Sequence, residues 1–157
     1  YLGSNVLKGV AQESALKMLE LTAGKVVTLF DTPLGFRHGP KSILNDKTLT
    51  VVYLSDNAYA RKYELDLVKE IVIQRKNNKI LVVCNTPCLE LNDIVDYIYC
   101  FGGYAKENVE LALLYTMCAQ LISFYKSLSL GITTDNPCPS GDVNRVVKGV
   151  VIYKYKI

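Results

Sequence analysis

Short runs rich in β-branched residues alternate with longer helical segments along this chain. The helices are expected from an N-cap at Ser4 or Asn5 to about Thr22, over Ala58–Lys76 and over Glu107–Leu128. The strands are expected at Leu2-Gly3, Lys25–Asp31, Lys47–Ser55, Lys79–Asn85 and Asp96–Phe101. Strands separated by helices pair in parallel through crossovers. The pattern therefore predicts an α/β fold, a three-layer sandwich with a mostly parallel sheet of about five strands flanked by helices.

The length of 157 residues suits one domain with a single core, covering residues 1–157. The net charge of +3 is small and the lysines are dispersed, with Arg75-Lys76 as a local pair, so no nucleic-acid interface is expected. No uninterrupted apolar run approaches the roughly 18 residues of a membrane span. The chain begins at Tyr1 rather than Met, so we expect a fragment or an excised domain.

Cysteine content and loop composition argue against cofactors and metals. Five cysteines, an odd number, do not suggest a disulfide framework, and Cys84 and Cys88 have no nearby histidine with which to form a zinc site. Buried thiols of a cytoplasmic protein are the preferred interpretation. The loops also lack the glycine spacings of dinucleotide and Walker-type sites. We therefore expect neither a metal nor a cofactor.

The single histidine lies in a loop that the fold would place at a functional edge. Parallel sheets bind ligands beyond the carboxyl ends of their strands, where the loop 31–39 is expected to lie. That loop carries Arg37 and His38. An imidazole can accept or donate a proton near neutral pH, and an arginine can bind a phosphate or carboxylate. The alternatives are a solvated or capping histidine and a solvated arginine.

The first helix carries a charged stripe. Glu13, Lys17 and Glu20 are spaced i, i+4 and i+7 and so share one face. Gly24 is expected as the C′ residue, which leaves Glu20 near the helix C-terminus, where the macrodipole disfavours a carboxylate. A general base at neutral pH needs a raised carboxylate pKa. The alternative is a charged stripe that is simply solvated. A separate candidate, Lys148, lies in an apolar stretch, and its alternative interpretation is a lysine that extends its ammonium group from apolar surroundings to water.

Three unusual phrases support a family resemblance. The segments ESALKMLELTAGKV, PLGFRHGPKS and DNPCPSGDVNRVV resemble the sugar isomerase (SIS) domain family, and within it the tagatose-6-phosphate ketose/aldose isomerases, also described as galactosamine-6-phosphate deaminase/isomerases. The similarity covers essentially the whole chain. It implies a flavodoxin-like SIS fold and the second of two SIS domains in one chain, the first being an N-terminal SIS domain.

The resemblance also implies roles for individual residues. Glu20 would be the catalytic carboxylate, His38 the ring-opening histidine and Lys148 a further catalytic lysine. The residues that would contact the substrate are Gly3, Ser4, Glu13, Lys17 and Arg37, with Gly3-Ser4 a degenerate version of the phosphate-binding serine loop found mainly in the first domain. The histidine loop of relatives reaches a neighbouring subunit, which implies a homodimer.

The activity implied is acid–base proton transfer on a hexose or hexosamine 6-phosphate. It would convert galactosamine 6-phosphate into tagatose 6-phosphate and ammonia, or interconvert an aldose and a ketose. Two alternatives belong to other classes: a non-catalytic module that senses sugar phosphates, and a structural dimerisation domain.

Overall fold

Four parallel strands form the central layer of the molecule. The structure is a computed structural model that describes residues 1–74, 76–105, 108–141 and 149–155. In these parts the strands β1 (Leu2–Gly3), β2 (Leu49–Tyr53), β3 (Lys79–Cys84) and β4 (Tyr97–Cys100) lie in the order β1-β2-β3-β4, and every pair is parallel. The predicted α/β class with a parallel sheet is confirmed, with four strands rather than five.

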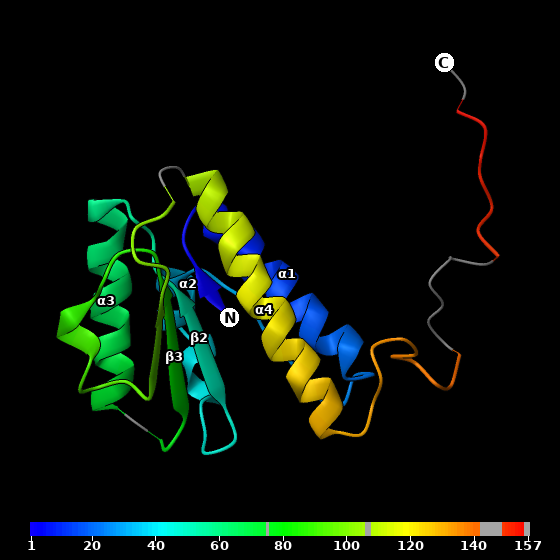
Figure 1. Cartoon of the computed structure of the whole chain (residues 1–157), viewed down its shortest axis with the longest axis horizontal. Helices are drawn as coiled ribbons and strands as arrows, with labels where there is room; N and C mark the ends of the chain where they lie inside the picture. Colours follow the sequence, from blue (N-terminus) through cyan, green and yellow to red (C-terminus); the bar gives the residue numbers. More distant parts are fainter. Residues whose placement is uncertain (75, 106–107, 142–148, 156–157) are drawn as a thin grey trace.

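Helices cover both faces of this sheet (Figure 1). One face packs against α1 (Val6–Leu21) and α4 (Asn108–Ser129), and the other against α3 (Ala58–Ile73). The chain also forms the short helix α2 (Pro33–Arg37) and the 3-10 turns η1 (Pro40–Ile43) and η2 (Leu89–Leu91).

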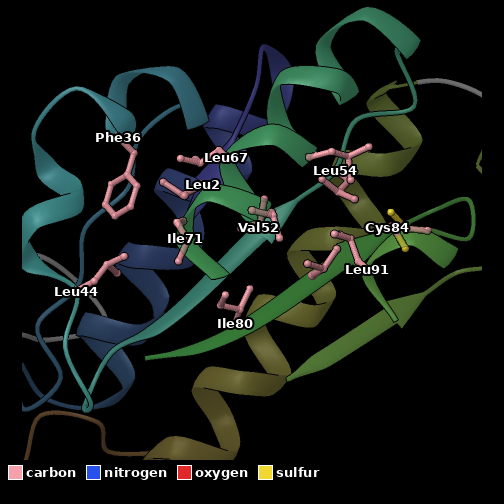
Figure 2. Close-up of a cluster of buried hydrophobic side chains, with 14 residues drawn as sticks. Leu2, Phe36, Leu44, Val52, Leu54, Leu67, Ile71, Ile80, Cys84 and Leu91 are labelled. Atoms are coloured by element: carbon pink, nitrogen blue, oxygen red, sulfur yellow. The ribbon is translucent and has the colours of Figure 1, made fainter. Parts of the chain in front are cut away.

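The alternation of side chains along β2 divides the core into two clusters. Val51 and Tyr53 face the cluster under α1 and α4, whereas Val52 and Leu54 belong to the cluster under α3. Figure 2 shows the second cluster, in which Ile71 of α3 lies close to the sheet. These four side chains, from Val51 to Leu54, are each at most 1% exposed, so both faces of this stretch are fully buried.

The segment 25–31, predicted as a strand, is not one. It makes a single parallel bridge, between Asp31 and Leu2, in which the N–H of Gly3 donates to the Asp31 carbonyl over 3.1 Å. A parallel ladder needs a partner residue opposite each position, and β1 offers only two strand residues. Val27 is consequently 87% exposed.

The predicted loop 32–39 contains α2. Thr32 is its N-cap, and its hydroxyl accepts a hydrogen bond from the N–H of Gly35 over 3.0 Å. Pro33 occupies the first helical turn, where it costs no hydrogen bond. The Thr-Pro pair is the sequence feature that could have predicted this helix.

The end of α1 differs by one residue from expectation. Ala23 takes the C′ position in the left-handed conformation, with φ 50°, and Gly24 follows it with φ 73°. The N–H of Ala23 donates to the Glu20 carbonyl and that of Gly24 to the Leu19 carbonyl, which is the Schellman pattern. At the other end, Asn5 is the N-cap residue but its side chain makes no capping hydrogen bond.

Helix α4 has two apolar faces. Over Val109–Ser129 it is long and apolar enough to cross a membrane, judged by length and composition alone. The sequence did not predict this, because it has no long uninterrupted apolar run. Its inner row, which includes Tyr115 and Ala119, is fully buried inside this domain. Of the most apolar 18-residue window of this helix, 28% is buried in the described part of the chain. Its outer row, with Leu113 and Met117, is exposed.

Candidate active site

The charged stripe on α1 is an ion-paired triad. Lys17 Nζ lies 2.7 Å from Glu20 Oε2 and 3.5 Å from Glu13 Oε1, so the lysine bridges both carboxylates. The hydrogen bond to Glu20 is the main cause that raises the pKa of Lys17. The Glu20 side chain is 44% exposed. The predicted common face is confirmed, and it presents an oriented carboxylate to solvent.

His38 is the C-cap residue of α2 and is exposed. It lines a cavity of about 370 Å³ together with Lys41, Gln74 and Lys76. Because α3 runs back from the carboxyl edge of the sheet, its end near Gln74 lies toward the amino ends of the strands. The expectation that His38 lies at the carboxyl edge is therefore wrong. The α2 helix and the η1 turn lead the chain back along α3 and carry the histidine with them.

Arg37 is engaged by the protein itself. Its Nε lies 2.8 Å from Glu70 Oε2, and Lys41 Nζ contacts the other oxygen, Oε1, of the same carboxylate. These two cations, Lys41 foremost, lower the pKa of Glu70. Sequence reasoning did not identify Glu70, because no local pattern connects a residue in the middle of a helix with a loop about thirty positions earlier.

Glu20 and His38 do not share a cavity within one copy of the described chain. They belong to opposite layers of the sandwich, since α1 packs with α4 and α2 packs with α3. Glu20 lines neither the cavity at His38 nor a larger cavity of about 600 Å³ that is bordered by Val27, Leu29 and Ile43. Glu20 and His38 are both located toward the amino ends of the strands, because α1 and α3 run in the same direction across the sheet.

The carboxyl edge of the sheet is filled by a buried carboxylate. Glu64 of α3 is 0% exposed, and its Oε2 accepts a hydrogen bond from the N–H of Ser55 over 2.8 Å. Burial raises the pKa of Glu64, while the hydroxyl of Ser4 and the charge of Arg61 oppose this shift. Ser4, predicted to contact the substrate, thus interacts with the protein's own carboxylate.

A sequence pattern could have identified Glu64. It occupies the apolar face of α3, at i, i+4 and i+7 with the buried residues Val68 and Ile71. A carboxylate on that face must be buried with hydrogen-bond partners or neutralised.

Gly3, the other predicted contact at this edge, is required for packing. A Cβ atom at this position would lie 2.2 Å from the carbonyl oxygen of Leu7. The backbone of β1 and the first turn of α1 approach each other too closely for any side chain there. The expected sharp turn between strand and helix is therefore present.

Two further expectations concern Lys148 and a metal site. Lys148 lies outside the described residues. In the described parts of the chain, no group of three or more histidine, cysteine, aspartate or glutamate side chains is arranged to hold a metal ion.

Comparison with known proteins identifies similar sequences and structures. No family model matches the chain. It is 45% identical over 159 residues to the D-galactosamine-6-phosphate deaminase AgaS of Escherichia coli, an alignment that covers 99% of this chain and 40% of that protein. The structure superimposes with a TM-score of 0.84 on tagatose-6-phosphate ketose/aldose isomerase from Escherichia coli, at 37% identity, covering 100% of this chain and 39% of that one.

A protein of Clostridium novyi, provisionally named as a tagatose-6-phosphate ketose/aldose isomerase, superimposes with a TM-score of 0.89 at 49% identity. This match covers 99% of the present chain and 40% of the Clostridium chain. The chain thus spans about two fifths of the length of these relatives.

Proposed function

We propose that this chain belongs to the sugar isomerase (SIS) domain family and is the second SIS domain of a cytoplasmic enzyme that deaminates and isomerises galactosamine 6-phosphate. The observation that carries the proposal is the 45% identity to a D-galactosamine-6-phosphate deaminase over 99% of the chain. An alignment of that extent spans both Glu20 and His38. The ion-paired Glu20 and the exposed His38 provide an acid–base pair for this chemistry.

The proposed reaction transfers protons within the sugar. His38 moves a proton between the ring oxygen and the C1 hydroxyl, which opens the ring. Glu20 then takes the proton from C2 and returns it to C1, while one proton of the C2 amine passes to the C1 oxygen, so that the amine becomes an imine and the C1 aldehyde becomes a hydroxyl. Water replaces the imine nitrogen, which releases ammonia and leaves tagatose 6-phosphate. Lys17 holds the Glu20 carboxylate in place, and Lys148 is assigned to stabilise the oxyanion.

The site would be completed between two copies of the chain. Glu20 and His38 lie on different layers of one copy, and we infer that they flank the apolar surface formed by Val27, Leu29 and Ile43. A two-fold axis through that surface exchanges the two flanks, and this places Glu20 of one copy beside His38 of the other, twice. Exposed apolar side chains concentrated on this surface support a homodimer of this kind.

The assignment is tested in a longer form of the protein that contains both proposed SIS domains. Glu20→Gln and His38→Ala are each expected to lower ammonia release from galactosamine 6-phosphate by about 10²- to 10⁴-fold, because each removes one proton-transfer group. Calorimetric binding of the sugar phosphate should persist. Asp66→Asn, at an exposed position of α3, is the control and should retain full activity.

Either of two results would contradict the proposal. Wild-type rates of ammonia release in both variants would remove Glu20 and His38 from the mechanism. Binding of the sugar phosphate by the unmodified protein without any turnover would instead identify a sensor module.

A further inference from the structure

We propose that Glu70 is a positioning residue that holds the His38 loop in its working position, an inference that rests on the function proposed above. Glu70 lies on α3, outside the loop and outside the three segments that carry the family resemblance. Its carboxylate binds one residue on each side of the histidine. The geometry gives it a role through His38 rather than in contact with the sugar.

The two cations held by Glu70 bracket the histidine in sequence. Arg37 immediately precedes His38, and Lys41 follows it by three residues. Arg37 Nε lies 2.8 Å from Oε2 of Glu70, and Lys41 Nζ contacts Oε1. Each carboxylate oxygen therefore holds one end of the segment 37–41 at a single point on α3. The three side chains are between 22% and 28% exposed, so the cluster is partly shielded from water.

The core contacts on the two sides of the loop lie at unequal distances from the histidine in sequence. Phe36, before the histidine, is 5% exposed and packs in the cluster under α3 with Ile71 (Figure 2). After the histidine, a Cβ atom built on Gly39 would find no atom within 4 Å, and both Gly39 and Pro40 are exposed. The contact of Lys41 with Glu70 is therefore the nearest attachment to α3 after the histidine, ahead of Leu44, which is 7% exposed and packs in the same cluster as Phe36.

A positioning role makes a prediction that a merely structural ion cluster does not. If Glu70 acts through His38, its loss is costly only while the imidazole is present. If it supports the fold in general, its loss is equally costly in both backgrounds. The comparison of single and double variants separates these cases.

The experiment measures ammonia release by the longer protein in four forms: unmodified, Glu70→Gln, His38→Ala and the double variant. Glu70→Gln is expected to lower kcat by about 10- to 100-fold with little change in KM, because displacing a catalytic group by about 1 Å can cost that much. In the His38→Ala background, Glu70→Gln should have no further effect.

A matched control removes another ion pair of the same helix. Lys69 of α3 lies 3.3 Å from Glu90, far from the histidine loop in sequence and not part of its cavity. Glu90→Gln should leave kcat unchanged. If Glu70→Gln does not fold, Lys41→Gln removes one arm of the same cluster and is compared in the same way.

The outcomes are distinguishable. An equal loss of kcat from Glu70→Gln in both backgrounds, or no loss in either, would overturn the positioning role and leave the proposed function intact. Full activity of His38→Ala would instead overturn the proposed function itself.

Discussion

The buried residue Glu64 affects both the carboxyl edge of the sheet and the pH dependence of folding stability. Its carboxylate is fully buried at the carboxyl edge, where it accepts the N–H of Ser55. Ser4 and Ser55 at this edge therefore interact with a carboxyl group of the protein itself. This arrangement agrees with the interpretation of Gly3-Ser4 as a degenerate phosphate loop and directs attention to the amino side of the sheet.

Glu64 is expected to make the folded state less stable as the pH rises. Burial raises its pKa in the folded protein above the unfolded value of about 4.3. Its contribution to stability is therefore fully present below the unfolded pKa and is lost as the pH rises through the folded pKa. Glu64→Gln removes this dependence. In urea unfolding of the 157-residue chain, the variant should gain stability relative to wild type between pH 4 and pH 7.

Glu90→Gln serves as the comparison for this experiment, because Glu90 is exposed. Its stability relative to wild type should change little over the same pH range. A Glu64→Gln difference that stays constant from pH 4 to pH 7 would show that the buried carboxyl group titrates normally.

At the scale of elements, the junction between β1 and α1 depends on close backbone approach. Gly3→Ala would place Cβ 2.2 Å from the oxygen and 2.6 Å from the carbonyl carbon of Leu7. Both are helix backbone atoms that a side-chain rotation cannot move away. The variant should lose about 1–3 kcal/mol of unfolding free energy in urea titrations, the usual cost of forcing atoms into a packed region.

Gly9→Ala is the matched control, because it adds the same methyl group within α1. A Cβ atom there has nothing within 4 Å. Alanine also favours the helix over glycine, so stability should rise by up to about 1 kcal/mol. Equal effects of the two substitutions would argue against the close contact at Gly3.

At the scale of the whole molecule, two exposed apolar surfaces compete as interfaces. One is formed by Val27, Leu29 and Ile43, between the flanks that carry Glu20 and His38. The other is the outer row of α4, where Leu113 is 73% exposed. In the homodimer proposed above, the first surface carries the two-fold axis that brings the two proposed catalytic groups together.

The double change Val27→Lys with Leu29→Lys should therefore dissociate the proposed dimer of the longer protein. In the dimer, each copy would bury two lysines in the interface. These lysines would lose their hydration and would face the two lysines of the other copy, which carry the same charge. Light scattering after size-exclusion chromatography measures the mass. Leu113→Lys, with the same charge on α4, should leave the mass unchanged. Dissociation by Leu113→Lys alone would assign the interface to α4 and separate it from the catalytic site.

Much of the fold could be predicted from local patterns. The helix expected over Ala58–Lys76 is observed as α3, Ala58–Ile73. The strand expected at Lys79–Asn85 is observed as β3, Lys79–Cys84. Such periodicities are readable because each element must bury one face or both. The strand expected over 25–31 was wrong because pairing depends on a partner strand, and a sequence run does not reveal how long that partner is.

The sequence by itself determined the α/β layers, the common face of Glu13, Lys17 and Glu20, and the resemblance to sugar isomerase (SIS) domain proteins. Only the tertiary structure decided that His38 lies beside α3, that Glu70 holds its neighbours Arg37 and Lys41, and that Glu64 fills the carboxyl edge. The physical reason is range. Helix and strand periodicity follow from interactions between residues a few positions apart, whereas ion pairs and cavities depend on which distant surfaces meet when the chain packs.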